Sequence, residues 1–196
     1  MKKTFEASVQ AIHFLLKTFG EMDKLKMVKV IYFADKRHLI FGGRTITGDN
    51  YMAMRHGPVG SMVLNILNRN VEYLESEQLQ YIDCYIQQGD SENNRKCTEN
   101  NMIYDQLSES DKKTLTKIGK KFNVMDGWAL VKLTHKYSEW AKFEEILRKE
   151  PTTCKQIALA DLFSSIDDDP LEISPDIVND SRMMYLGHYA GAVSGD

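Results

Sequence analysis

The stretch from Leu25 to Phe41 carries apolar side chains on almost every face of the helix that its spacing predicts. A helix that is apolar all round is usually the buried centre of its domain. Asp23 can cap the first turn of this helix, and Gly42 and Gly43 can end it. We therefore expect the rest of the chain to pack around it.

Asp35 interrupts the apolar surface of this helix. It shares one stripe with Val28, Ile31, Tyr32 and Leu39. A carboxylate at a buried position is costly unless it is paired or hydrogen-bonded. One interpretation is an internal tie between the helix and the following loop, with Arg44, Arg55 or a backbone amide as partner. The alternative is that Asp35 forms one wall of a binding cleft.

The 196 residues suit one domain, 1–196, with one core. A net charge of -3 argues against a general nucleic-acid or membrane-surface binder, so we expect neither partner. No apolar run approaches the roughly 20 residues of a membrane helix, and no hydrophobic leader follows Lys3, so we expect a cytoplasmic protein. The cysteines, Cys84, Cys97 and Cys154, lack zinc-site spacing, which predicts reduced and mostly buried thiols.

The pattern predicts a mainly α (α+β) fold, a compact helical domain around the central helix with one small antiparallel β-sheet. Helices are expected over 5–19, after the capping-box-like Ser108–Asp111, over 125–137, after Ser138, over 157–166 and after Ser174–Pro175. Pro58 suits the first turn of a helix that continues to Leu67. Strands are expected over 51–55 and 79–86, joined in one sheet. The C-terminal helices fall within 152–190.

Gly43 and Gly48 have the separation of a phosphate-binding loop. That loop next requires Lys and then Ser or Thr, whereas this chain has Asp49 and Asn50. A carboxylate there would repel phosphate, so we exclude nucleotide binding at this turn and expect no cofactor.

Histidines offer weak candidates for chemistry. His56 and Asp35 would form an acid–base pair only if the loop folds back, and no nucleophile or metal ligand stands at a suitable spacing. His135 lies on the apolar stripe that contains Trp128, where a hydrogen-bonded core histidine and a functional one are both consistent with the pattern. Trp140 is expected in the core. We predict no catalytic residue, no metal site and no enzyme.

Charges are unevenly distributed along the second half. The helix after Ser108 carries five lysines between residues 112 and 121, which suits a solvated face or contact with RNA or an acidic partner. Residues 156–181 carry seven acids and no Lys or Arg. This segment is interpreted as a solubilising tail or as an acidic surface that steers a basic partner.

Several motifs together resemble one known family. The segment from Lys26 to Leu39 reads K-x-x-K-V-I-Y-F-A-D-K-R-H-L, and residues 43–59 read G-x-x-I-T-G-D-x-Y-x-A-M-x-H-G-P-V. L-S-E-S-D from Leu107, L-x-x-L-T-H-K from Leu130 and then Trp140 follow in order. This combination resembles the Panacea domain family, also described as the SocA-like antitoxin domain or the phage-associated GepA type. The resemblance covers about 24–140, with a weaker continuation after Thr152.

The resemblance implies a helical antitoxin from bacteria, phages or other mobile elements. Members are typically encoded beside a toxin, often one that attacks translation, and neutralise it by direct protein–protein binding. Alternatives are delivery of the toxin to a AAA+ protease and a phage accessory or anti-defence role. Some relatives carry a DNA-binding segment, but no helix-turn-helix pattern is visible in this chain. The resemblance does not specify the oligomeric state.

The family motif also marks candidate partner-binding or structural residues. They are Tyr32, Phe33, Asp35, Arg37, Gly48, Asp49, Tyr51, Ala53, His56, Gly57, Pro58, Thr134, His135 and Trp140.

Overall fold

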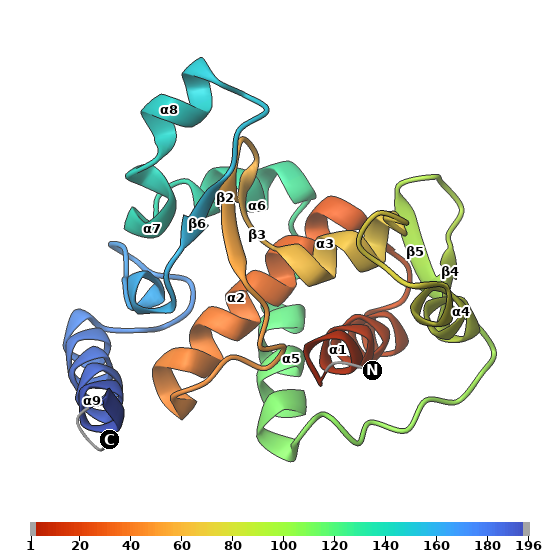
Figure 1. The fold of residues 1–196 in the computed structure, drawn as a ribbon, viewed down its shortest axis with the longest axis horizontal. Helices are drawn as coiled ribbons and strands as arrows, with labels where there is room; N and C mark the ends of the chain where they lie inside the picture. The colour runs from red at the N-terminus through yellow and green to blue at the C-terminus, as the bar shows by residue number, and fades with distance from the viewer. Residues whose placement is uncertain (1–2, 194–196) are drawn as a thin grey trace.

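Helix α2 (Lys24–Gly42) runs through the centre of the computed structural model, which describes residues 3–193 (Figure 1). It begins at Lys24 because the Asp23 carboxylate accepts a hydrogen bond from the Lys26 amide at 3.1 Å. It ends before Gly43, whose backbone is left-handed with φ 72°. Most of its side chains are buried, which confirms the prediction of a central buried helix.

The described residues form nine α-helices and one short 3-10 helix, so the fold is mainly helical. Helices α1, α5 and α6 pack directly on α2. The other helices are α1 (Lys3–Phe19), α3 (Ser61–Asn68), α4 (Ser76–Tyr85), α5 (Glu109–Phe122), α6 (Gly127–Thr134), α7 (Ser138–Ala141), α8 (Glu144–Lys149), the 3-10 helix η1 (Leu159–Leu162) and α9 (Pro175–Val193).

Two small antiparallel sheets flank the helices, where the sequence predicted one. The first has strand order β1-β5-β4 and the second β3-β2-β6. In the second sheet, Tyr51 pairs with Gly60 on one side and with Ile157 on the other. The strands are β1 (Met22–Asp23), β2 (Tyr51–Met54), β3 (Gly57–Gly60), β4 (Ile86–Gln88), β5 (Asn94–Cys97) and β6 (Lys155–Ile157).

The strand predicted over 79–86 is wrong, since most of it is helix α4. Gln78 and Ile82 are buried four residues apart on one face, and Glu75 and Gln78 form a capping box. The two strands that follow, β4 and β5, pair with each other, and β5 pairs with β1, so neither joins the 51–54 segment. Figure 1 shows this sheet and α4 together at one edge of the molecule.

Pro58 does not start a helix. It lies in β3 opposite Ala53, and α3 begins later, at Ser61. Strand β3 is at the edge of its sheet, where a residue without an N–H is tolerated.

The helix predicted over 157–166 is also wrong. Its first residue, Ile157, pairs with β2 as the last residue of β6 and is buried, and only Leu159–Leu162 turns helically.

The helix predicted over 125–137 is shorter, spanning Gly127–Thr134. Asp126 accepts a hydrogen bond from the Ala129 amide at 2.8 Å and starts it. The three cysteines are free, but Cys84 and Cys154 are exposed and Cys97 is half-buried, so the expectation of mostly buried thiols is wrong. Within residues 3–193, none of the helices has the length and apolar character needed to cross a membrane.

Candidate functional site

The Asp35 carboxylate holds the loop that follows α2. It accepts hydrogen bonds from the amides of Ile46 (2.7 Å) and Thr47 (3.2 Å) and from the hydroxyls of Thr47 and Tyr51 (2.6 Å). Complete burial raises the pKa of Asp35, although these hydrogen bonds oppose the rise. The internal tie between helix and loop is therefore present, and backbone amides and hydroxyls make it.

Neither arginine considered as a partner of Asp35 fills that role. Arg44 turns to Asp111 in the first turn of α5, with Nη2 2.8 Å from the carboxylate. Arg55 is exposed at the turn between β2 and β3. Arg44 instead forms a contact between the loop and α5.

The Asp49 carboxylate occupies the N-terminus of α3. It accepts hydrogen bonds from the amides of Met62 and Val63, both at 2.9 Å, and from the Ser61 hydroxyl at 3.2 Å. The free amides of a helix start attract negative charge, and here a carboxylate of the chain itself satisfies them.

A buried polar cluster joins α2 to α7 and to the segment after η1. Glu139 accepts hydrogen bonds from the Tyr32 hydroxyl and from the Lys36 ammonium, each at 2.5 Å. Lys36 also donates to the Leu162 carbonyl (2.9 Å) and the Ser164 hydroxyl (2.8 Å). Burial lowers the pKa of Lys36, and the Glu139 charge opposes this.

Gly57 lets three elements meet. A side chain on Gly57 would overlap the Thr134 hydroxyl of α6 and come within 3.0 Å of Lys29 Nζ of α2. Lys29 has no exposed surface, and its ammonium donates to the Pro58 carbonyl at 2.8 Å. Desolvation by burial lowers the pKa of Lys29 to about 7.

Two histidines of the motif lie against tryptophan rings near the β2–β3 hairpin. His135 lies flat on Trp140, with ring centroids 3.5 Å apart, and Trp140 Nε1 donates to the Met54 carbonyl at 2.8 Å. His56 meets Trp128 edge-on at 5.0 Å. Burial lowers the pKa of both histidines, and the positive charge of Lys29 adds to this. Trp140 is buried, as predicted.

Arg37 lies apart from this cluster, with its guanidinium 4.3 Å from the centre of the Phe41 ring. Most other motif side chains are buried and serve the internal contacts described above. His56, at the hairpin turn, and Gly48 are exposed. The motif residues therefore form a mostly buried framework, which extends to the protein surface at the hairpin turn.

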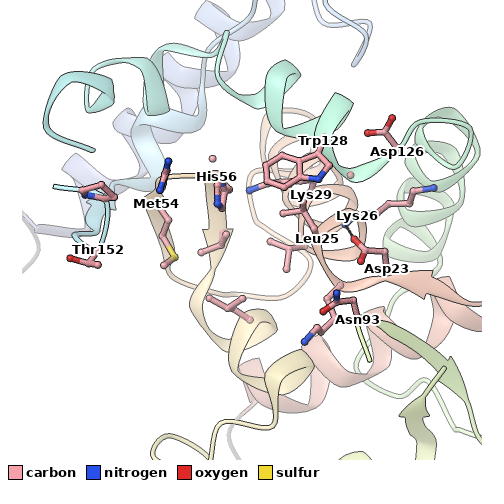
Figure 2. Close-up of a pocket in the computed structure, with 18 residues that line it drawn as sticks. Asp23, Leu25, Lys26, Lys29, Met54, His56, Asn93, Asp126, Trp128 and Thr152 are labelled. Atoms are coloured by element: carbon pink, nitrogen blue, oxygen red, sulfur yellow. Dashed lines mark hydrogen bonds between the residues drawn. The ribbon is translucent and has the colours of Figure 1, made fainter. Parts of the chain in front are cut away.

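Beside this framework lies a groove of about 900 Å³ between the start of α2, the β2–β3 hairpin and the start of α6 (Figure 2). Its walls are mainly apolar, with Leu25, Val28, Leu64 and Trp128 among them. In Figure 2, Lys29 lies between His56 and Trp128. Trp128, placed by sequence on an apolar stripe, is 58% exposed at this rim.

The arrangement of these side chains suits a binding surface better than a catalytic site. The loop occupies both oxygens of Asp35, and His56 lies against Trp128, so these two residues do not form an acid–base pair. In the part of the chain that the structure describes, no group of three or more His, Cys, Asp or Glu side chains could hold a metal ion.

Sequence reasoning missed the roles of three charged residues, Lys29, Lys36 and Glu139. Lysine and glutamate are rarely buried, so a solvated position was the natural expectation. A signal was present, because Lys29 and Lys36 lie seven residues apart on a helix that is otherwise apolar all round. Such a helix leaves them little exposed surface.

Comparison with known proteins gives one family. The family model described as antitoxin SocA-like, Panacea domain, matches residues 27–141, which is more than half of the chain. The matched segment includes most of α2, the β2–β3 hairpin and α6. No curated protein and no solved structure matches.

Proposed function

Because this chain belongs to the SocA-like antitoxin family with a Panacea domain, we propose that it neutralises a cognate protein toxin by binding to it directly. The family match over residues 27–141 carries this proposal. The toxin would be a translation inhibitor encoded beside this chain in a bacterium or a phage of the GepA-associated type. Both proteins would then act in the cytoplasm, where translation takes place.

The internal use of the motif supports a binding role. Asp35, Asp49 and Glu139 hold loops and helix ends in place through several hydrogen bonds each. Such contacts make a rigid framework, and a preorganised surface loses less conformational entropy when a partner binds. In this proposal the chain needs no cofactor and catalyses no reaction.

Co-expression tests the proposal. Cells that carry the toxin from the adjacent reading frame should grow when this chain is produced as well, and the two proteins should co-purify. A stable complex with persistent toxicity would contradict neutralisation by binding. Repeating the assay in a host without the relevant AAA+ protease separates the mechanisms, since loss of rescue there would identify proteolytic delivery.

Single substitutions test for hidden enzymatic activity. Alanine at His56 or His135 should leave rescue intact wherever the folded protein persists. Loss of rescue with unchanged toxin binding and thermal stability would instead indicate chemistry at these residues.

A further inference from the structure

The groove between the start of α2, the β2–β3 hairpin and α6 has positive charges that the chain itself does not neutralise. Its lining includes the side chains of Lys24, Lys29 and Arg55. Among the described residues, no carboxylate lies within ion-pair distance of these three. Lys29 is the most unusual, because it is fully buried and its ammonium has one carbonyl as hydrogen-bond partner.

The two carboxylates in the lining serve other purposes. Asp23 accepts a hydrogen bond from the Lys26 amide at the start of α2, and Asp126 accepts one from the Ala129 amide at the start of α6. Both are helix caps and face the positive ends of helix dipoles. The groove therefore keeps an excess of positive charge beside apolar walls.

The walls favour a peptide over a nucleic acid. Leu25, Val28 and Leu64 line the groove, and Trp128 offers a large ring that is 58% exposed. Exposed aromatic rings next to cations are typical of protein-binding surfaces. A phosphate backbone would use the cations but leave these walls unfilled.

We propose that this groove binds an amphipathic acidic segment of the cognate toxin, with apolar side chains against Trp128 and Leu64 and a carboxylate side chain attracted by Lys24 and Arg55. The inference rests on the proposed antitoxin function and names the surface that carries it. A carboxylate beside Arg55 would also favour the protonated form of Lys29, whose pKa burial lowers to about 7.

Charge reversal at the rim provides the first test. Lys24→Glu/Arg55→Glu changes the groove, and Lys113→Glu/Lys120→Glu makes the same charge change on exposed positions of α5. With purified toxin, the groove variant should bind at least ten times more weakly than the wild type, and the α5 variant should bind within about threefold of it. Both variants should unfold at the wild-type temperature. Equal weakening by both variants would overturn the proposal, since net charge alone would explain it.

Two further variants test the apolar wall formed by Trp128 and the buried Lys29 that lines the groove. Trp128→Ala and Lys29→Met should each weaken binding at least tenfold without lowering the unfolding temperature. Overlapping peptides of the toxin should identify one acidic–apolar segment that binds, and replacing its Asp and Glu by Asn and Gln should abolish binding to the wild type. Binding that survives both variants unchanged would overturn the groove as the docking surface.

The outcomes distinguish this inference from the proposed function. Full toxin binding and rescue by the groove variants would leave the antitoxin function standing and refute the groove. Failure of the wild-type chain to bind toxin would refute both. Sedimentation of the free chain tests a second copy as occupant, and a dimer that the groove substitutions dissociate would contradict a toxin segment there.

Discussion

At the scale of single residues, Gly57 is the point where α2, the hairpin and α6 meet. Its backbone has φ 90°, and a side chain there would overlap the Thr134 hydroxyl. We predict that Gly57→Ala lowers the free energy of unfolding by about 3 kcal/mol, through both backbone strain and the clash.

Gly20→Ala is the matched control. Gly20 has a similar φ of 83° but no neighbouring atom within 4 Å of an added Cβ. This change should cost only the backbone strain, about 1 kcal/mol. Urea unfolding of both variants measures the difference, and equal losses would show that the contact between Gly57 and Thr134 is unimportant.

Lys29 makes stability depend on pH. Burial lowers its pKa from 10.5 to about 7, so between these values the unfolded chain binds a proton that the folded chain does not. Stability should therefore rise with pH through this window, by about 2 kcal/mol from pH 7 to pH 9 for this one group. Lys29→Met should remove that part of the slope. The measurement is urea unfolding of both proteins across the range, and parallel slopes would contradict an ammonium buried without a counter-charge.

At the scale of elements, α3 depends on a carboxylate that lies outside its own chain segment. Asp49 accepts hydrogen bonds from the amides of Met62 and Val63, the first turn of α3. Asp49→Ala should lower the free energy of unfolding by about 2 kcal/mol, because it leaves these donors unsatisfied. Asp90→Ala, at an exposed ion pair with Lys96, should change it by less than about 0.5 kcal/mol. Similar effects of the two substitutions would contradict the capping role.

The contact between α2 and the C-terminal half rests on Glu139. Glu139→Gln leaves the Lys36 ammonium buried without a counter-charge, and should cost about 3 kcal/mol. The control, Glu145→Gln, breaks an exposed pair with Lys149 and should cost less than about 0.5 kcal/mol. Lys36→Met should recover part of the loss when combined with Glu139→Gln. A double variant less stable than Glu139→Gln alone would contradict the charge-based explanation.

The elements that were predicted correctly have sequence signals within their own segments. The helices starting at Asp23, Ser108 and Ser174 were each predicted from a cap and a helical apolar spacing. The errors arose where partners distant in sequence decide the structure. Residues 155–157 form a strand because β2 offers them an edge, and nothing within the segment reveals this.

Part of the candidate site could also be predicted from the sequence. The position of Asp35 on the apolar stripe of α2 indicated an internal tie, and the motif placed His56 and Gly57 together. The burial of Lys29 beside Pro58 and Thr134 was not predictable, since it requires the hairpin to fold onto α2 and α6. The groove arises from the same packing, because its walls come from six separate segments of the chain.

At the scale of the whole molecule, the basic helix and the acidic segment partly neutralise each other. Glu172 lies within 2.9 Å of both Lys117 and Lys121 on α5, and their hydrogen bonds lower its pKa to about 2. Asp161 pairs with Lys142 in the same region. Lys117 and Lys121, on the helix that the sequence suggested for RNA or an acidic partner, and Glu172, in the segment suggested for a basic partner, therefore make contacts within the chain. The cations of the groove have no such partners among residues 3–193.

The most direct measurement uses purified components. The toxin is added to a cell-free translation reaction that contains no protease, with and without this chain, and protein synthesis is followed. Direct neutralisation predicts that synthesis is restored once the chain is present in amounts comparable with the toxin, and that Trp128→Ala requires at least tenfold more. Synthesis that stays blocked while the chain still rescues growing cells would contradict neutralisation by binding.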